Sequence, residues 1–149
     1  MKLRLLLSAI LLAVACSPQP GSVNGASGAE AAGPTSPPLL ASLQAATRGD
    51  SVRFVLQVTN TTAAPIDLRF SSGQTFDFAV VTGGREVWRW SADMMFTQAL
   101  RNVTVAAGET LTHEASWLPP SGTAGELEAV GELTSSNHPV EQRVRFRYP

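Results

Sequence analysis

Residues 71–100 read SSGQTFDFAVVTGGREVWRWSADMMFTQAL, and aromatic residues recur through this stretch at the spacing of β-strands. Trp88 and Trp90 are separated by one residue, a spacing that places both side chains on one face of a β-strand. Phe76 and Phe78 repeat that spacing earlier in the stretch, and a Gly-Gly pair between the two aromatic pairs supplies a turn. The stretch therefore predicts two aromatic strands joined by a tight turn.

The same alternation of apolar and polar residues recurs outside this stretch, in short runs separated by turn residues. Each run is typical of a half-buried strand. The expected strands are 52–58, 66–70, 76–81, 86–90, 102–106, 110–117, 126–133 and 143–148. With eight or nine such strands we expect an all-β, antiparallel immunoglobulin-like β-sandwich. Because the chain has one cysteine, packing of tryptophan and phenylalanine must join the two sheets in place of a disulfide.

The first sixteen residues have the features of an export signal. Lys2 and Arg4 precede an apolar run at 5–14, which is short for a membrane span but normal for a signal-peptide core. The run ends in Leu-Ala-Val-Ala-Cys16, which resembles a bacterial lipobox. We expect 1–16 to be a lipoprotein signal peptide and Cys16 to carry the lipid that anchors the exported chain to a membrane of the bacterial cell envelope. The alternatives are a plain signal peptide with an incidental cysteine, or an uncleaved N-terminal anchor.

The composition changes twice after Cys16. Residues 17–38 are rich in Ser, Pro, Gly and Ala, so they cannot bury a core and are expected to form a flexible linker. Residues 39–149 carry the alternating pattern and are expected to form one domain. Over the whole chain 44% of residues are apolar and 15% are charged, as in globular proteins, and the formal charge of -1 argues against a nucleic-acid partner.

Three segments carry a resemblance to a known family: SSGQTFDF at 71–78, EVWRWS at 86–91 and DMMFTQAL at 93–100. In this order they resemble the BsuPI-type intracellular proteinase inhibitors. The resemblance implies a sandwich fold and inhibition of a protease, expected to be a serine protease, by an exposed and rigid loop. Within these segments we expect structural roles for Gly73, Gln74, Asp77, Trp88 and Trp90.

Two loops are candidates for contact with the protease. The first follows Trp90 and contains Ser91, Asp93, Met94, Met95, Phe96, Thr97 and Gln98. Its apolar centre could fill a protease specificity pocket, or it could plug the open end of the sandwich. Ser91 or Asp93 is expected to cap a short helical turn there. The second loop, at 119–125, is framed by prolines and has the composition of an ordinary connection.

Asp77 and the two tryptophans each allow two interpretations. Asp77 lies between two phenylalanines and should point away from them, either as a solvent-facing carboxylate or, as we expect, as a hydrogen-bond partner of the loop at 91–98. Trp88 and Trp90 either belong to the core or form an exposed platform for a protein or a glycan. We expect at least one of them in the core, because tryptophan is usually largely buried.

Catalytic and metal-binding patterns are missing from the sequence. It contains no G-x-S-x-G, no H-E-x-x-H and no glycine-rich phosphate loop, and its two histidines are far apart. We expect His113 to be packed in a strand and His138 to lie in a turn, with no metal and no cofactor. The alternative to inhibition is therefore a non-inhibitory binding or scaffold module of the cell envelope that holds a protein or glycan partner.

Overall fold

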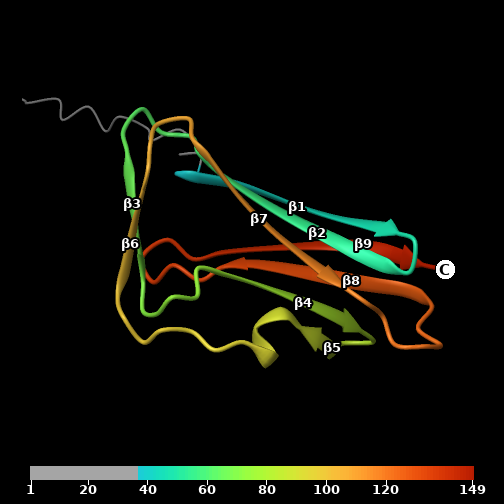
Figure 1. Ribbon diagram of the computed structural model, residues 1–149. Helices are drawn as coiled ribbons and strands as arrows, with labels where there is room; N and C mark the ends of the chain where they lie inside the picture. Colours follow the sequence, from blue (N-terminus) through green and yellow to red (C-terminus); the bar gives the residue numbers. More distant parts are fainter. Residues whose placement is uncertain (1–36) are drawn as a thin grey trace, which may run out of the picture. The chain divides into compact units, whose positions relative to one another are not determined.

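Nine antiparallel strands and one short 3-10 helix make up residues 37–149, which are the residues that the computed structural model describes (Figure 1). The elements are β1 (Leu39–Arg48), β2 (Ser51–Asn60), β3 (Ile66–Phe70), β4 (Phe76–Thr82), β5 (Arg85–Arg89), η1 (Trp90–Asp93), β6 (Arg101–Val105), β7 (Thr110–Trp117), β8 (Gly125–Leu133) and β9 (Val140–Tyr148). Cys16, the expected signal peptide at 1–16 and most of the expected linker at 17–38 lie outside the described residues.

The strands form three antiparallel sheets. One has the order β1-β2-β7, the second has the order β5-β4-β8-β9, and β3 pairs with β6 in a third. β9 also lies against β1, which brings the edges of the two larger sheets together (Figure 1). This arrangement confirms the expected all-β, antiparallel immunoglobulin-like sandwich. Among residues 37–149, no helix is long and apolar enough to cross a membrane.

The core lies between the two larger sheets and follows the alternation of the sequence. Val52, Phe54, Leu56 and Val58 of β2 all point inward and are fully buried. Phe54 stacks on Phe78 of the opposite sheet, with 5.9 Å between ring centroids. Aromatic packing therefore joins the sheets, as expected for a domain whose described residues contain no cysteine.

β1 is the strand that the alternation did not resolve as a separate run. Two of its inward positions are Ala41 and Ala45, which are half-buried against the core. Alanine is depleted in strands because its small side chain packs weakly on a pleated surface. The pairing of β1 with the whole length of β2, rather than strong local preference, explains why this segment is extended.

The end of β5 differs from the prediction in two ways. The strand ends at Arg89 and Trp90 begins η1, so the expectation that both tryptophans share one strand is wrong. The expected cap by Ser91 or Asp93 is also wrong, because Arg89 occupies the N-cap position without a side-chain hydrogen bond. Ser91 lies inside the helical turn, and its hydroxyl is used elsewhere.

The β4–β5 hairpin places the two candidate loops at opposite ends of β5. Gly83 and Gly84 form its turn with φ of 54° and 77°, a conformation that glycine adopts without strain. The loop at 119–125 lies beside this turn, whereas η1 and the loop that follows it lie at the other end (Figure 1). One protease cleft would therefore engage one of these loops and not the other.

Candidate functional site

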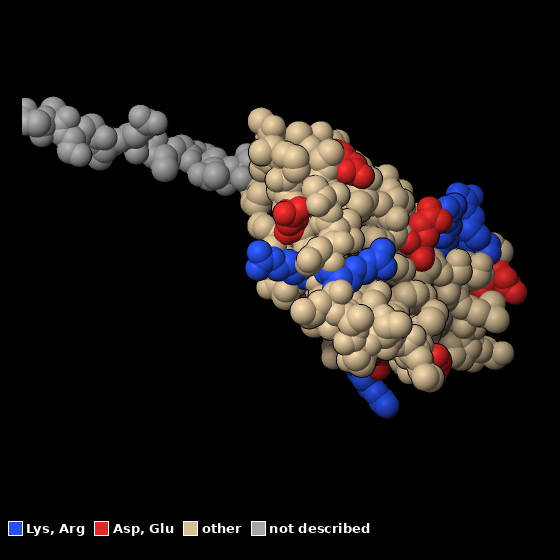
Figure 2. Space-filling model, turned by 60° about the vertical axis from the view of Figure 1, so that its left-hand side comes forward, with Lys and Arg blue, Asp and Glu red and all other residues tan. Residues whose placement is uncertain are grey.

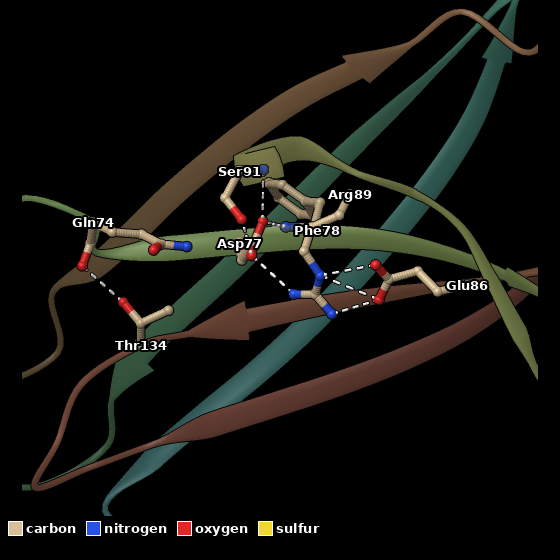
Figure 3. Close-up of polar contacts among 7 residues, drawn as sticks. All are labelled: Gln74, Asp77, Phe78, Glu86, Arg89, Ser91 and Thr134. Carbon is tan, nitrogen blue, oxygen red and sulfur yellow. Dashed lines mark hydrogen bonds and ion pairs between the residues drawn. The ribbon is translucent and has the colours of Figure 1, made fainter. Parts of the chain in front are cut away.

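Asp77 is a buried carboxylate at the base of the first candidate loop. It points away from the aromatic core, as its position between two phenylalanines requires, yet only 3% of its surface is exposed. Its Oδ1 accepts hydrogen bonds from the backbone N–H groups of Phe78 (2.8 Å) and Ser91 (3.2 Å). Its Oδ2 accepts a bond from the Ser91 hydroxyl at 2.6 Å (Figure 3). The carboxylate therefore holds η1 against β4, and the interpretation of Asp77 as a solvent-facing residue is wrong.

Arg89 completes this hydrogen-bond network from the neighbouring strand. Its Nη1 donates to Asp77 Oδ2 at 2.8 Å, and its Nη2 donates to Glu86 Oε2 at 2.6 Å (Figure 3). The hydrogen bonds that Arg89 donates to Glu86, and then that to Asp77, raise the pKa of its guanidinium above the ordinary value. Arg89 therefore stays charged and balances the buried carboxylate, while about a third of its side chain remains exposed to solvent.

Sequence reasoning missed Arg89 because a β-bulge changes the register of the hairpin. Beyond the turn, Val81 pairs with Glu86, but the next pair is Val80 with Trp88, so Val87 has no partner on β4. The extra residue turns Trp88 inward and places Arg89 opposite Ala79, on the same outward face as Asp77. The bulge could have been inferred from the count of residues in the hairpin. An odd number of residues, 81–87, separates Val80 from Trp88, and a regular hairpin with a two-residue turn would pair residues separated by an even number.

Gly73 holds the far end of the same loop. Its N–H donates to the carbonyl of Thr97 at 2.8 Å. A Cβ atom at Gly73 would lie 2.6 Å from the Thr97 hydroxyl, which is closer than real Cβ contacts come. Glycine is therefore required here by close approach of the two segments rather than by an unusual backbone angle.

Gln74 fastens the turn at 71–75 to the rest of the domain through its backbone. The Gln74 carbonyl accepts a bond from the Thr134 hydroxyl at 2.9 Å (Figure 3), and the Thr134 N–H donates to the Thr75 carbonyl at 3.1 Å. The Gln74 N–H in turn donates to the Ser72 hydroxyl at 3.2 Å. The segment that carries Gly73 is thus itself held by the β8–β9 connection.

An aromatic column runs from the loop to the far sheet. Phe96 packs on Trp90 at 5.8 Å between ring centroids, Trp90 stacks on Phe76 at 4.4 Å, and Phe76 stacks on His113 of β7 at 4.5 Å. Trp88 packs separately, against Phe54. Both tryptophans are half-buried against the core. Trp90 supports the loop and Trp88 packs against the core, so the two do not form an open platform.

The two methionines at the centre of the loop are exposed. The side chain of Met95 is 100% exposed and that of Met94 is 46% exposed. Phe96 is half-buried on Trp90. The expectation that these residues plug the end of the sandwich is therefore wrong for Met95, while Phe96 does cover the aromatic column.

His113 is a packed strand residue. Its Nε2 is buried and has no hydrogen-bond partner among the described residues. Burial in this apolar site lowers the pKa of His113 below 6.5, its ordinary value, because the charged form is poorly solvated there. His138 lies in the turn after Ser135, whose hydroxyl accepts a bond from its N–H at 3.3 Å. Among residues 37–149, no group of three His, Cys, Asp or Glu side chains could hold a metal ion.

Charged side chains are interspersed over the surface. On the face shown in Figure 2, acidic and basic residues occur singly or in small groups, and most of the surface is uncharged. Arg143, Arg145 and Arg147 point to solvent from β9, where Arg143 pairs with Glu141 at 2.7 Å and Glu128 at 3.1 Å. The arginine stripe is a solvated strand face whose charge is partly balanced by these acids.

Solved structures that are similar to this chain share little sequence with it. They include the β-glucosidase EmGH1 from Erythrobacter marinus (16% identity, TM-score 0.42), covering 73% of this chain and 15% of that one. They also include the sporulation control protein Spo0M from Bacillus subtilis, with 14% identity and a TM-score of 0.42. The match covers 73% of this chain and 47% of Spo0M. A third is a FixG-related protein from Vibrio parahaemolyticus, with 16% identity and a TM-score of 0.38. The match covers 74% of this chain and 95% of that protein. This chain thus spans less than half of the first two.

The family comparison covers most of the domain. No curated protein matches the chain. The family model for BsuPI, described as intracellular proteinase inhibitor, matches residues 39–138. This range includes the hairpin, the buried Asp77 and the whole of the loop at 91–98. The chain therefore belongs to the BsuPI family of intracellular proteinase inhibitors.

Proposed function

We propose that this protein inhibits a serine protease and that the segment 91–98, called here the inhibitory loop, occupies the protease cleft. Membership of a proteinase inhibitor family supports the class of function. The observation that carries the choice of loop is the full exposure of Met95 between two ends that are both fixed. An inhibitory loop needs this combination, because it must reach into a cleft without folding back.

The fixed ends reduce the entropy that the loop loses on binding. Ser91 is bonded to the buried Asp77 at one end, and Thr97 is bonded to Gly73 at the other. Ordering a flexible segment on binding costs about 0.5–1.5 kcal/mol for each immobilised side chain, and a pre-organised loop avoids much of this cost. Pre-organised inhibitors accordingly change little in backbone conformation on binding.

The loop at 119–125 lacks this combination. Within the loop, the Thr123 N–H donates to the Pro120 carbonyl at 3.1 Å, and the exposed side chains are small. Leu118, at its start, is the large exposed residue nearby. This loop has no bulky apolar apex, and its distant contact is the pairing of Gly125 with Tyr148 where β8 begins. We therefore assign contact with the protease to the inhibitory loop.

The proposed function is tested by titration. The full chain, purified in mild detergent, is added to an active-site-titrated protease of the subtilisin type. We expect activity to fall in proportion to the amount added until the two proteins are equimolar. Full protease activity at molar excess, with the chain shown to be folded by circular dichroism, would remove this class of protease as the target.

We also propose that the inhibitor is displayed on the bacterial cell envelope as a lipoprotein. The proposal rests on the sequence at 1–16 and on Cys16 as the residue that carries the lipid. Cys16→Ser should abolish the increase in intact mass that diacylglycerol causes and should release the chain from the membrane fraction. Unchanged processing and partitioning of this variant would contradict the proposal.

One observation favours the alternative of a non-inhibitory binding module. A hollow of about 280 Å³ lies beside the loop at 119–125, lined by Val87, Trp117, Pro120 and Leu127 among others. Its volume is slightly below the roughly 300 Å³ at which small-molecule sites begin. If the folded chain inhibits no protease but binds an envelope protein or glycan through this hollow, binding and not inhibition is its function.

A further inference from the structure

One residue of the inhibitory loop, Met95, is better placed than its neighbours to contact a protease. Met95 is fully exposed, Met94 is about half as exposed, and Phe96 is half-buried on Trp90. Leu100 is 87% exposed but lies beyond the bond between Gly73 and Thr97, outside the held segment. Met95 is therefore the large apolar side chain that is both held by its neighbours and free of contacts itself.

The backbone of Met95 is equally free. Among residues 37–149, neither the N–H nor the carbonyl of Met95 bonds to another backbone group, whereas the Met94 N–H donates to the Ser91 carbonyl at 3.1 Å. An extended peptide binds a protein edge through such unpaired backbone groups, and its exposed side chains then fill pockets. A protease cleft can thus pair with Met95 without breaking a bond inside the loop.

We infer that Met95 fills the primary specificity pocket of the target protease and that Met95–Phe96 is the peptide bond presented to the catalytic serine. This inference rests on the proposed function. The long and unbranched methionine side chain fits a deep apolar pocket. Proteases specific for basic residues have a carboxylate at the base of this pocket. Met95 would leave that buried charge unpaired, so we expect the protein not to inhibit these proteases.

The carboxyl side of this bond is held in place after any cleavage. Phe96 packs on Trp90, and its carbonyl accepts a hydrogen bond from Gln98 Nε2 at 3.3 Å. Thr97 follows, with its carbonyl bonded to Gly73. On the other side, Ser91 is bonded to Asp77, so both halves of a cut loop stay attached to the domain.

This attachment makes the chemistry reversible. The catalytic serine oxygen bonds to the Met95 carbonyl carbon, the C–N bond to Phe96 breaks, and the amine of Phe96 leaves with the proton that the serine gave up. Because the Phe96 amine remains beside the ester, it attacks the same carbonyl carbon again. The peptide bond reforms and the serine is released with its proton, so hydrolysis by water is slow.

The specificity is tested with Met95→Lys and the neighbouring control Met94→Lys in the full chain. Two proteases are used, one with an apolar specificity pocket and one specific for lysine and arginine. We expect Met95→Lys to weaken inhibition of the first by about 100-fold and to create inhibition of the second. We expect Met94→Lys to change the inhibition of each of the two proteases by less than about 10-fold. Because Met95 is fully exposed, neither folding nor yield should change.

The outcomes separate this inference from the proposed function. A wild-type chain that inhibits neither protease overturns the proposed function and the inference with it. A wild-type chain that inhibits, with a Met95→Lys variant of unchanged specificity, overturns the inference and leaves the function intact.

The bond is identified by long incubation of the wild-type chain with the inhibited protease, followed by peptide mapping. We expect one slow cut, between Met95 and Phe96, and a rate that rises about 10-fold in Phe96→Ala because the amine is then held less firmly. A first cut elsewhere in the inhibitory loop or in 119–125 would overturn the assignment. The wild-type cut site alone decides this, even where Phe96→Ala is less stable.

Discussion

The inhibitory loop and the loop at 119–125 are of similar length and both are exposed, but they are held in different ways. The inhibitory loop is tied at its ends to Asp77 on β4 and to Gly73, residues that lie far from it in sequence. The other loop contains a local bond from Thr123 to Pro120 and two glycines at positive φ, Gly122 at 83° and Gly125 at 101°, and it ends where Gly125 pairs with Tyr148. Exposure alone therefore does not distinguish the two loops, whereas a large exposed side chain between two tertiary anchors is found in the inhibitory loop and not in the loop at 119–125.

The largest expected effect comes from removing the anchor at Asp77. Asp77→Ala leaves Nη1 of Arg89, the Ser91 hydroxyl and two backbone N–H groups without the acceptor that Asp77 provides, while Arg89 keeps its bonds to Glu86. We expect a loss of about 3 kcal/mol in the free energy of unfolding, at the lower end for buried pairs because Arg89 is partly solvated. Urea unfolding measures this loss, and inhibition should weaken with it.

A surface ion pair provides the control for this variant. Arg53 and Glu114 also pair at 2.6 Å, but both side chains are nearly half exposed. Glu114→Ala should cost less than about 1 kcal/mol and leave inhibition unchanged. If Asp77→Ala were no more harmful than Glu114→Ala, the buried carboxylate would not be the anchor of the inhibitory loop.

The second expected effect is at Gly73. A methyl group in Gly73→Ala would meet the Thr97 hydroxyl at 2.6 Å and push the two segments apart. We expect a loss of about 2 kcal/mol, with weaker inhibition, because closely packed segments tolerate added atoms poorly. Thr97→Ala in the same chain removes the clashing oxygen and should restore most of both losses, which a double-mutant cycle measures.

Gly122→Ala gives the matching change in the other loop. No atom lies within 4 Å of a Cβ at this position, so its cost comes from the positive φ and should be about 1 kcal/mol. Inhibition should be unaffected. Equal loss of inhibition in Gly73→Ala and Gly122→Ala would remove the difference between the two loops.

A smaller effect is expected on acidification, through the aromatic column. The pKa of His113 is lowered in the folded state, so the unfolded chain binds its proton first as the pH falls. The free energy of unfolding should therefore decrease below about pH 6.5 and level off once the folded pKa is passed. His113→Phe keeps the stack on Phe76 and removes this contribution.

The measurement is urea unfolding at about pH 7.5 and about pH 5.5, for wild type, His113→Phe and the control His138→Gln. The difference between the two pH values should shrink in His113→Phe and persist in His138→Gln. An unchanged difference in His113→Phe would show that His113 does not contribute to the acid sensitivity of the domain.

The smallest effect is expected from side chains in the loop at 119–125. Ser121→Ala removes an exposed hydroxyl that forms no hydrogen bond with the described residues. We expect a change of less than about 0.5 kcal/mol in the free energy of unfolding, and unchanged inhibition. A clear loss of inhibition would assign contact with the protease to this loop.

Alternation in the sequence was sufficient to predict the sandwich and most of its strands. The inward residues of β2 have the expected period of two, and β7 has the predicted bounds, Thr110–Trp117. The hairpin was harder because register depends on counting from the turn. The unpaired Val87 shifts every later residue of β5 to the other face, and the alternation in EVWRW does not reveal this bulge unless residues are also counted from the turn.

The candidate loop was located from its sequence, but its anchors were not fully predicted. The expected hydrogen bond between Asp77 and the loop at 91–98 is confirmed by its contacts with Ser91, whereas the sequence contains no sign that Arg89 also pairs with Asp77. The contact between Gly73 and Thr97 joins two loops. Loops lack the alternation of apolar and polar residues, so the sequence pattern does not predict contacts between them. Such contacts follow from how the strands are connected in space.

Hydrogen–deuterium exchange of the full chain shows directly which of the two loops contacts the protease. The chain is compared alone and with a target serine protease whose catalytic serine is replaced by alanine, so that binding occurs without cleavage. We expect new protection in peptides that contain 94–98 and unchanged exchange in peptides that contain 119–125. Protection of 119–125 with unchanged exchange at 94–98 would contradict this expectation.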